Sequence, residues 1–145
     1  MKALLCSECH LAILDGKKPE KCPLCHATTF EEKEDAIHEA GDQTNFSESE
    51  KKHIPDIIVS KTCSIIGEDC RDVHVKIGKI LHPMLPEHFI NNIDFYIDKE
   101  FVARKELRPD KVYPSATVHL KKLGKTFTVI ERCNVHGTWI AEIQL

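Results

Sequence analysis

Four cysteines near the start of the chain have the spacing of a metal site. They lie in the segment CSECHLAILDGKKPEKCPLCH as two CxxC pairs, Cys6 with Cys9 and Cys22 with Cys25. Each CxxC turn can direct two thiolates at one ion, and two such turns complete a tetrahedral shell of four sulfurs. That geometry suits zinc or a single iron. In a reducing compartment, CxxC pairs favour metal binding over disulfides.

A second interpretation of the same motifs stays open. Each pair is followed by a histidine, His10 or His26, and CxxCH is the attachment pattern of c-type haem. Haem attachment normally requires export, and the segment MKALLCSECH has no apolar stretch as long as that of a signal peptide. Two haems on so short a segment would also leave little protein to cover them. We therefore expect a metal ion at this position.

A second, scattered group of histidines and one cysteine is a candidate for another metal site. His53 precedes a β-branched run, His82 and His88 lie in LHPMLPEHFI, and Cys133 and His136 lie in ERCNVHGTW. Prolines stiffen the second of these segments, and a glycine closes the tight turn of the third. Each residue alone is typical of a surface or a core position. Together they contain the imidazole and thiolate ligands that transition metals prefer.

The composition limits the classes of protein that these sites can belong to. The chain has 145 residues and a formal net charge of −3, which does not favour nucleic-acid or membrane binding. No segment approaches the roughly 20 apolar residues of a membrane span. We therefore expect a soluble, cytoplasmic protein.

Three regions of different character follow one another along the chain. Residues 1–30 have too few apolar residues for a core, so a metal must hold them together. Residues 31–50 are rich in acidic side chains and predict a solvated linker. Residues 51–145 contain short runs rich in β-branched and aromatic residues, separated by Gly and Pro: IPDIIVS, DVHVKIG, FINNIDFYID, SATVHLKKL, KTFTVIERC and TWIAEIQL. Short strands at this spacing predict a mainly β fold, an antiparallel sandwich of immunoglobulin size.

The segment DGKKPEKCPLCHATTF resembles rubredoxin, and most closely the rubredoxin-like domain of rubrerythrins. The resemblance covers about residues 4–30 and implies iron in the four-cysteine site, with zinc as the alternative. The family usually has glycine where this chain has His10 and His26. Glycine suits a backbone position with a positive φ angle, so the two histidines depart from the pattern at a demanding place.

The segments KHIP, HPMLPEH and CNVHG resemble, in the same order, superoxide reductase, the desulfoferrodoxin and neelaredoxin family. The resemblance implies a seven-stranded immunoglobulin-like β-sandwich over residues 51–145, with the metal in loops at one end. It implies one mononuclear non-haem iron with four equatorial imidazoles and an axial thiolate, from His53, His82, His88, His136 and Cys133. The implied reaction is the one-electron reduction of superoxide to hydrogen peroxide. The implied electron donor is rubredoxin or an NAD(P)H-dependent rubredoxin reductase, and the implied assembly is a dimer or tetramer.

The residues before His53 depart from that family. Relatives typically read Glu-Lys-His, whereas this chain reads Lys51-Lys52-His53. Lys52 matches the family's lysine, whose implied role is to attract superoxide and to orient a water that protonates peroxide. Lys51 stands where the family has the glutamate that caps ferric iron. Glu50, one residue earlier, is then the candidate sixth ligand.

The remaining histidines and cysteines are given ordinary roles. We assign His38 to the linker, and His74 and His119 to strand faces. Cys63 and Cys70 flank a turn that contains glycine, and we expect both to be reduced, with a regulatory disulfide as the alternative. The alternative for the whole chain is a rubredoxin-like electron carrier or an iron-binding redox sensor.

Overall fold

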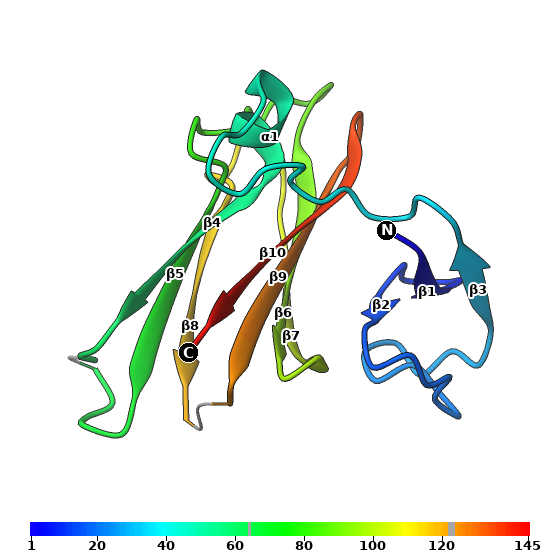
Figure 1. The fold of residues 1–145 in the computed structure, drawn as a ribbon, viewed down its shortest axis with the longest axis horizontal. Helices are drawn as coiled ribbons and strands as arrows, with labels where there is room; N and C mark the ends of the chain where they lie inside the picture. The colour runs from blue at the N-terminus through cyan, green and yellow to red at the C-terminus, as the bar shows by residue number, and fades with distance from the viewer. Residues whose placement is uncertain (64, 122–123) are drawn as a thin grey trace.

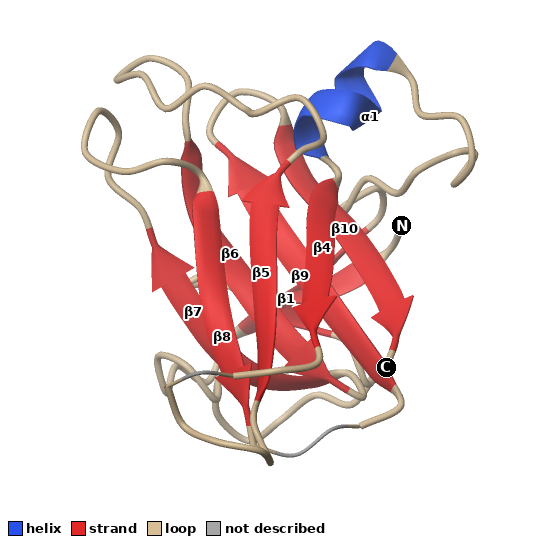
Figure 2. Cartoon of the chain, turned by 90° about the vertical axis from the view of Figure 1, so that its left-hand side faces the viewer, coloured by secondary structure: helices blue, strands red, loops and turns tan. Residues whose placement is uncertain are grey.

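Two β-sheets packed face to face form the body of the computed structural model, which describes residues 1–63, 65–121 and 124–145. The strand orders are β10-β9-β6-β7 and β4-β5-β8, and neighbouring strands are antiparallel. Figure 2 shows the two layers. The larger sheet contains β6 (Ile90–Ile97), β7 (Glu100–Glu106), β9 (Thr126–Cys133) and β10 (Gly137–Gln144). The smaller contains β4 (Pro55–Ser60), β5 (Arg71–Ile77) and β8 (Ser115–Leu120). The prediction of a mainly β, seven-stranded sandwich is confirmed.

Alternating apolar side chains build the core between the two sheets. Val73, Val75 and Ile77 of β5 are buried, and they face a cluster that includes Phe95 and Phe127 of the other sheet. The two phenylalanine rings stack with centroids 5.9 Å apart. The six strands expected from the sequence are present, although the predicted run SATVHLKKL extends into residues 122–123, which lie outside the described part. The pattern of apolar runs did not predict β7, because the charged residues of EFVARKE hide the alternation of apolar and polar side chains.

A small third sheet at the N-terminus carries the four cysteines. It has the order β2-β1-β3, with β1 (Ala3–Cys6), β2 (Ala12–Ile13) and β3 (Phe30–Lys33). We call residues 1–33 the cysteine module. β3 pairs with β1, so strand pairing continues into residues 31–33 of the segment 31–50 that the sequence predicted as a linker. The division into residues 1–30, 31–50 and 51–145 stays a prediction of domain organisation.

The cysteine module packs on the outer face of the larger sheet (Figure 1). Leu11 and Ala12 of the module share one buried cluster with Tyr96 of β6 and Ile130 of β9. The Tyr96 hydroxyl donates a hydrogen bond of 2.8 Å to the Ala12 carbonyl. Outer faces of sandwich sheets are ordinarily polar, so these apolar residues are explained by the module that covers them.

A six-residue helix, α1 (Glu48–His53), leads into the sandwich. Ser47 caps its N-terminus, and Ser47 and Glu50 form a reciprocal capping box. The Ser-x-x-Glu signature of that box is present in the sequence, but the high charge of the segment concealed it. α1 ends at His53, which is buried. Among the described residues, no helix is long and apolar enough to cross a membrane.

Candidate metal centres

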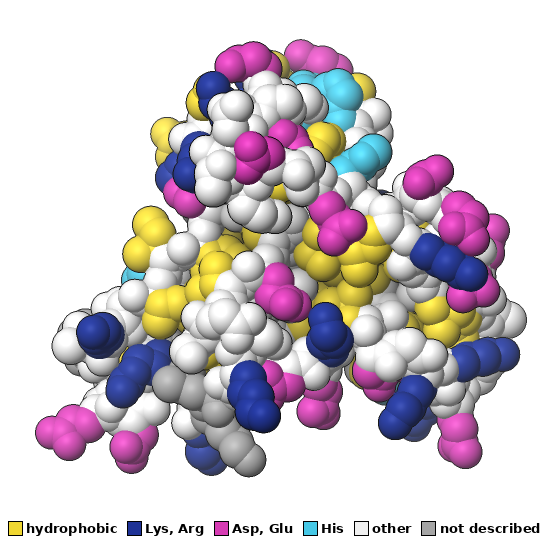
Figure 3. All heavy atoms as spheres, viewed as in Figure 1, with side chains coloured by type: hydrophobic (Ala, Val, Ile, Leu, Met, Phe, Trp, Pro, Cys, Tyr) yellow, Lys and Arg dark blue, Asp and Glu magenta, His cyan; other side chains and the backbone are white. Residues whose placement is uncertain are grey.

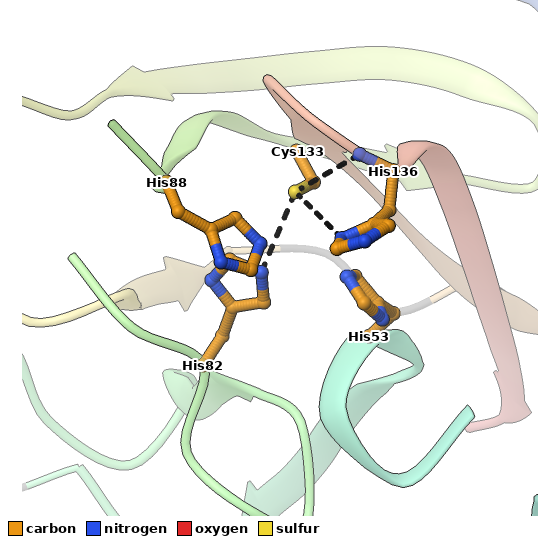
Figure 4. Close-up of side chains that lie close together, drawn as sticks. All are labelled: His53, His82, His88, Cys133 and His136. Atoms are coloured by element: carbon orange, nitrogen blue, oxygen red, sulfur yellow. Dashed lines mark hydrogen bonds between the residues drawn. The ribbon is translucent and has the colours of Figure 1, made fainter. Parts of the chain in front are cut away.

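Four histidines and one cysteine converge at the end of the sandwich that carries α1 (Figure 4). We call these five residues the His4Cys cluster, and one potential ligand atom from each lies within 4.8 Å of every other. The cluster draws on three separated segments: the end of α1, the connection from β5 to β6, and the turn from β9 to β10. Its members are His53, His82, His88, Cys133 and His136. The structure therefore brings together all five residues that the sequence singled out.

The four imidazoles form a closed ring. Going round it, the centroids of His53, His82, His88 and His136 lie 4.9, 4.5, 4.9 and 5.0 Å apart. Neighbouring planes meet at 65° to 78°, so the rings stand edge to face around a common centre. The Cys133 sulfur lies 3.4 Å from His82 Nε2 and 3.8 Å from His136 Nδ1. Four nitrogens with one sulfur beside them can bind one ion.

Hydrogen bonds to the backbone set the direction in which two of the imidazoles face. Because a carbonyl only accepts, His53 Nδ1–H donates to the Ser49 carbonyl at 2.8 Å, and His82 Nδ1–H donates to the Pro83 carbonyl at 2.7 Å. Nε2 of each ring is therefore unprotonated and carries a lone pair. Among the described residues, the buried Nε2 atoms of His53 and His88 have no hydrogen-bond partner. Such nitrogens are expected where a metal ligand is held by its other ring nitrogen, so the cluster fits a metal such as iron.

Burial keeps these imidazoles neutral. It lowers the pKa of His82 to about 4, and neighbouring imidazoles act in the same direction. Burial likewise lowers the pKa values of His53 and His88. A metal binds only the neutral imidazole. At neutral pH a metal can therefore bind these rings without first displacing protons from them.

The four cysteines of the module also converge on one point. The sulfurs of Cys6 and Cys25 lie 3.5 Å apart and those of Cys9 and Cys22 lie 3.6 Å apart, and all four lie within 4.8 Å of one another. One group of four sulfurs matches the single metal ion that we expected, and it does not match two separate haem attachments. Thiolates in this arrangement suit zinc or a single iron.

The two CxxC turns have the same backbone form. The His10 N–H donates to the Cys6 carbonyl and the His26 N–H donates to the Cys22 carbonyl, each at 3.0 Å. His10 has φ = 64° and His26 has φ = 66°. These are left-handed backbone positions that favour glycine, the residue that the resemblance to rubredoxin led us to expect there.

A comparison of the sequence with protein-family models shows which family the chain belongs to. The family model described as Desulfoferrodoxin matches residues 45–142, which include all of the sandwich strands except the last two residues of β10. The chain belongs to the desulfoferrodoxin family. The match begins after the cysteine module.

Similarities to individual proteins support this family assignment. A desulfoferrodoxin homolog of Archaeoglobus fulgidus is 32% identical over 93 residues, which are 63% of each protein. A superoxide reductase of Pyrococcus abyssi is 34% identical over 107 residues, covering 66% of this chain and 88% of the relative. The solved superoxide reductase from Nanoarchaeum equitans superposes with a TM-score of 0.55 at 28% identity, covering 66% and 94% of the two chains. This chain matches less than two thirds of the Archaeoglobus relative's length.

Lys52 directly precedes His53 of the His4Cys cluster in the chain. Its side chain is exposed at the end of α1, next to the buried His53 in sequence. After burial and the imidazole of His136, the charge of Lys52 is among the causes that lower the pKa of His88. The lysine therefore acts electrostatically on the ligand ring from the solvent side.

Glu50, the candidate sixth ligand, makes hydrogen bonds at the N-terminal end of α1. One carboxylate oxygen accepts a hydrogen bond from the Ser47 N–H at 2.7 Å, and the other accepts one from the Gly41 N–H at 2.7 Å. These hydrogen bonds lower the pKa of Glu50. Both oxygens are thus used at the N-terminus of α1, and Glu50 is absent from the group of ligand atoms that converge in the described structure. The structure supports a capping role for Glu50.

Gly78 allows the loop after β5 to lie directly against the end of α1. A Cβ atom at this position would lie 2.5 Å from the Lys51 carbonyl oxygen and 2.9 Å from the Lys52 carbonyl carbon. The Ile80 N–H donates to the same Lys51 carbonyl at 3.0 Å. This contact joins the segment that carries His82 to the helix that carries His53. The sequence offered no signal for it beyond the presence of a glycine.

Trp139 contacts two residues of the His4Cys cluster, and sequence reasoning missed it. Its indole stacks on His53 with centroids 4.7 Å apart and planes 15° apart, and its Nε1–H donates to the His136 carbonyl at 3.1 Å. His38 covers the indole from a centroid distance of 4.5 Å. His38 also pairs by its backbone with β10, so it is held against the sandwich instead of lying in a free linker.

Cys133 is buried, and its sulfur lies beside the imidazoles of His82 and His136. Burial raises the pKa of this thiol, and the His136 N–H donates to the sulfur at 3.4 Å. Glu131, two residues earlier, is fully buried, and neither of its carboxylate oxygens has a hydrogen-bond partner among the described residues. Burial raises the pKa of Glu131 well above its usual range and so favours its neutral form.

Proposed function

We propose that this desulfoferrodoxin reduces superoxide to hydrogen peroxide at a mononuclear iron in the His4Cys cluster. The observation that supports this most strongly is the closed ring of four imidazoles with one buried sulfur beside it. The relatives named superoxide reductases support it independently. The proposed iron ligands are His53, His82, His88, Cys133 and His136.

Iron bound in this cluster would supply the single electron, and two protons complete the conversion of superoxide to hydrogen peroxide. The protein's part is to hold neutral imidazoles in fixed orientations, which the hydrogen bonds to Ser49 and Pro83 provide. The Cys133 thiolate donates electron density to a metal in this site. The His136 N–H that points at the sulfur moderates that donation.

Lys52 is the proposed catalytic residue for handling the substrate. His136 is exposed and His88 is half-buried, whereas His53 and His82 are buried, so the ring opens to solvent on the side of His88 and His136. A lysine ammonium near that opening attracts a small anion. It can also hold a water molecule in position to protonate the product. The exposed position of Lys52 and its effect on the pKa of His88 support this role.

The cysteine module is proposed to hold a second metal, iron by its resemblance to rubredoxin or zinc as the alternative. Cys6, Cys9, Cys22 and Cys25 are the proposed ligands. Burial opposes ionisation of Cys6, but hydrogen bonds from the backbone N–H groups of Cys9 and Glu8 and from neighbouring thiols lower its pKa to about 7. Elemental analysis with a visible spectrum separates the two metals: one iron with one zinc makes the module structural, and two irons allow it to relay electrons. Rubredoxin or its NAD(P)H-dependent reductase is the proposed donor, and a dimer or tetramer the proposed assembly.

Mixing reduced protein with superoxide tests the proposed reaction. A superoxide reductase is oxidised stoichiometrically and releases hydrogen peroxide without evolving dioxygen. A rubredoxin-like carrier or an iron-binding sensor shows only slow oxidation that does not depend on the His4Cys cluster. The control is a Cys133→Ser variant, which keeps the four imidazoles and lacks the sulfur. Equal rates in the two proteins would contradict the proposal.

A further inference from the structure

A third group of potential ligands lies at the end of the sandwich opposite to the His4Cys cluster. Cys63 and Cys70 lie in the connection from β4 to β5, Asp72 lies near the start of β5, and His119 lies near the end of β8. In Figure 1 this connection is at the lower left, far from α1. Asp72 and His119 are direct partners in the β5–β8 ladder. The turn and the ladder together bring four side chains to one place.

The ligand atoms of this third group are close together. His119 Nδ1 lies 3.6 Å from the Cys63 sulfur and 3.6 Å from the Cys70 sulfur. The Cys70 sulfur lies 3.5 Å from Asp72 Oδ1. Each of the four atoms lies within 4.8 Å of every other, as in the two clusters described above.

These separations are close to the edges of a zinc tetrahedron. With Zn–S bonds of about 2.3 Å and Zn–N or Zn–O bonds of about 2.0–2.1 Å, a tetrahedral angle puts sulfur about 3.6 Å from nitrogen or oxygen. Three of the observed distances, 3.6, 3.6 and 3.5 Å, match this value. The fourth, from His119 Nδ1 to Asp72 Oδ1, is a hydrogen bond of 2.7 Å. That pair would have to separate by roughly 0.7 Å to admit an ion.

We propose that Cys63, Cys70, Asp72 and His119 bind one Zn²⁺ ion. Two thiolates, one imidazole and one carboxylate are a ligand set that zinc accepts, and four protein ligands close the coordination shell. The site is therefore structural, without an open position for a substrate. The expectation of ordinary reduced thiols, or of a disulfide between them, does not account for His119, which lies equally close to both sulfurs.

The ion would join the β4–β5 connection to an edge strand. β8 is at one edge of its sheet, and β5 is its neighbour. The two cysteines are supplied by the connection, whereas Asp72 and His119 are supplied by the paired strands. One zinc ion would therefore link the β4–β5 connection to β5 and β8 at this end of the sandwich. The iron proposed for the other end lies among different loops.

Metal content of the full-length protein tests the proposal. The protein is expressed with added Zn²⁺ and compared with a Cys63→Ser/Cys70→Ser double variant and with a His119→Ala variant, by elemental analysis and thiol counting. We expect the double variant to lose one metal ion per chain. We expect His119→Ala to release zinc to a competing chelator at a concentration at least tenfold lower than wild type. The matched control is His74→Ala, because His74 also contacts a residue across the β5–β8 ladder, Thr117, but lies outside the group.

Co²⁺ is the second probe, and it reports the ligands directly. Two thiolates bound to Co²⁺ give sulfur-to-metal charge-transfer absorption, so the spectrum of wild type minus that of the double variant should contain this band. The visible spectrum of the His4Cys iron shows whether each variant is folded. Equal metal content in wild type and the double variant would overturn the proposal. A Cys63–Cys70 disulfide in metal-free wild type that excludes added zinc would overturn it too.

Discussion

The guanidinium of Arg104 in β7 donates a hydrogen bond of 2.8 Å to the backbone carbonyl of Cys9 in the cysteine module. The same guanidinium forms a two-pronged ion pair with Asp94, with distances of 2.6 and 2.8 Å. Both side chains are almost fully buried, with exposures of 7% and 3%. One arginine thus neutralises a buried carboxylate and connects the sandwich to a metal-binding turn.

Replacing Arg104 by methionine should destabilise the protein by about 3–5 kcal/mol, because Asp94 would remain buried without its cation. Urea unfolding measures the change. The control is Lys105→Ala on the same strand, where an exposed lysine contacts only the Ser115 carbonyl and the change should stay within about 0.5 kcal/mol. Adding Asp94→Asn to the methionine variant should restore part of the loss. Equal stability of the methionine variant and wild type would show that the ion pair contributes little.

Removing residues 1–45 tests the proposed domain organisation. The truncation keeps all five His4Cys residues, so the product should fold and bind one iron. It should also bind hydrophobic dyes more strongly than the full chain, because Tyr96 and Ile130 lose the module that covers them. Sedimentation and dye fluorescence measure this. An unfolded or iron-free product would mean that the module and the sandwich form one folding unit.

Lys52→Ala should lower the second-order rate with superoxide roughly tenfold or more, the effect of one well-placed charge and proton-delivery group. The difference from wild type should shrink as salt rises, because salt screens the attraction. Lys51→Ala is the matched control: it removes the same charge from the same helix, but Lys51 is paired with Glu48 at 3.1 Å. A similar loss in both variants would show that the rate depends on the net charge of the helix and not on Lys52 specifically.

Gly78→Ala should weaken iron binding by about 10- to 100-fold, in the range seen when groups that position metal ligands are altered. The added Cβ would collide with the backbone of Lys51 and Lys52 and displace the end of α1 that carries His53. Chelator competition measures the affinity, and circular dichroism checks the sandwich. Gly41→Ala is the control, since its Cβ would make only one contact, at 4.0 Å from Glu50.

His82 should make the stability of the metal-free protein rise between about pH 4 and pH 6.5, while Glu131, whose pKa burial raises, acts in the opposite direction. Burial lowers the pKa of His82 to about 4 in the folded state, whereas an unfolded histidine titrates near 6.5. Between these values the unfolded state binds more protons, so the free energy of unfolding increases with pH. His53 and His88 act in the same direction. Urea unfolding of wild type and a His82→Ala variant across this range measures the histidine's share of the slope, and equal slopes in the two proteins would contradict the prediction.

The chemistry of the four-cysteine cluster could be predicted from the sequence because it depends on local motifs. A CxxC turn directs two thiolates at one point whatever surrounds it, and Cys6, Cys9, Cys22 and Cys25 converge as the spacing indicates. The His4Cys residues come from three segments, and their grouping followed from resemblance to a family, not from spacing. The alternation of Val73, Val75 and Ile77 likewise predicted a half-buried strand.

The tertiary structure decided which distant side chains meet. His119 contacts Asp72 because the β5–β8 ladder has one register, and no local pattern specifies a register between strands that are far apart in the chain. Tyr96 and Ile130 are buried only because a separate module covers them. The sequence suggested Glu50 only as a candidate sixth ligand, whereas its hydrogen bonds depend on where α1 begins and on the position of the Gly41 N–H. Contacts of this kind arise from the packing of whole elements, which residue types and spacing do not determine.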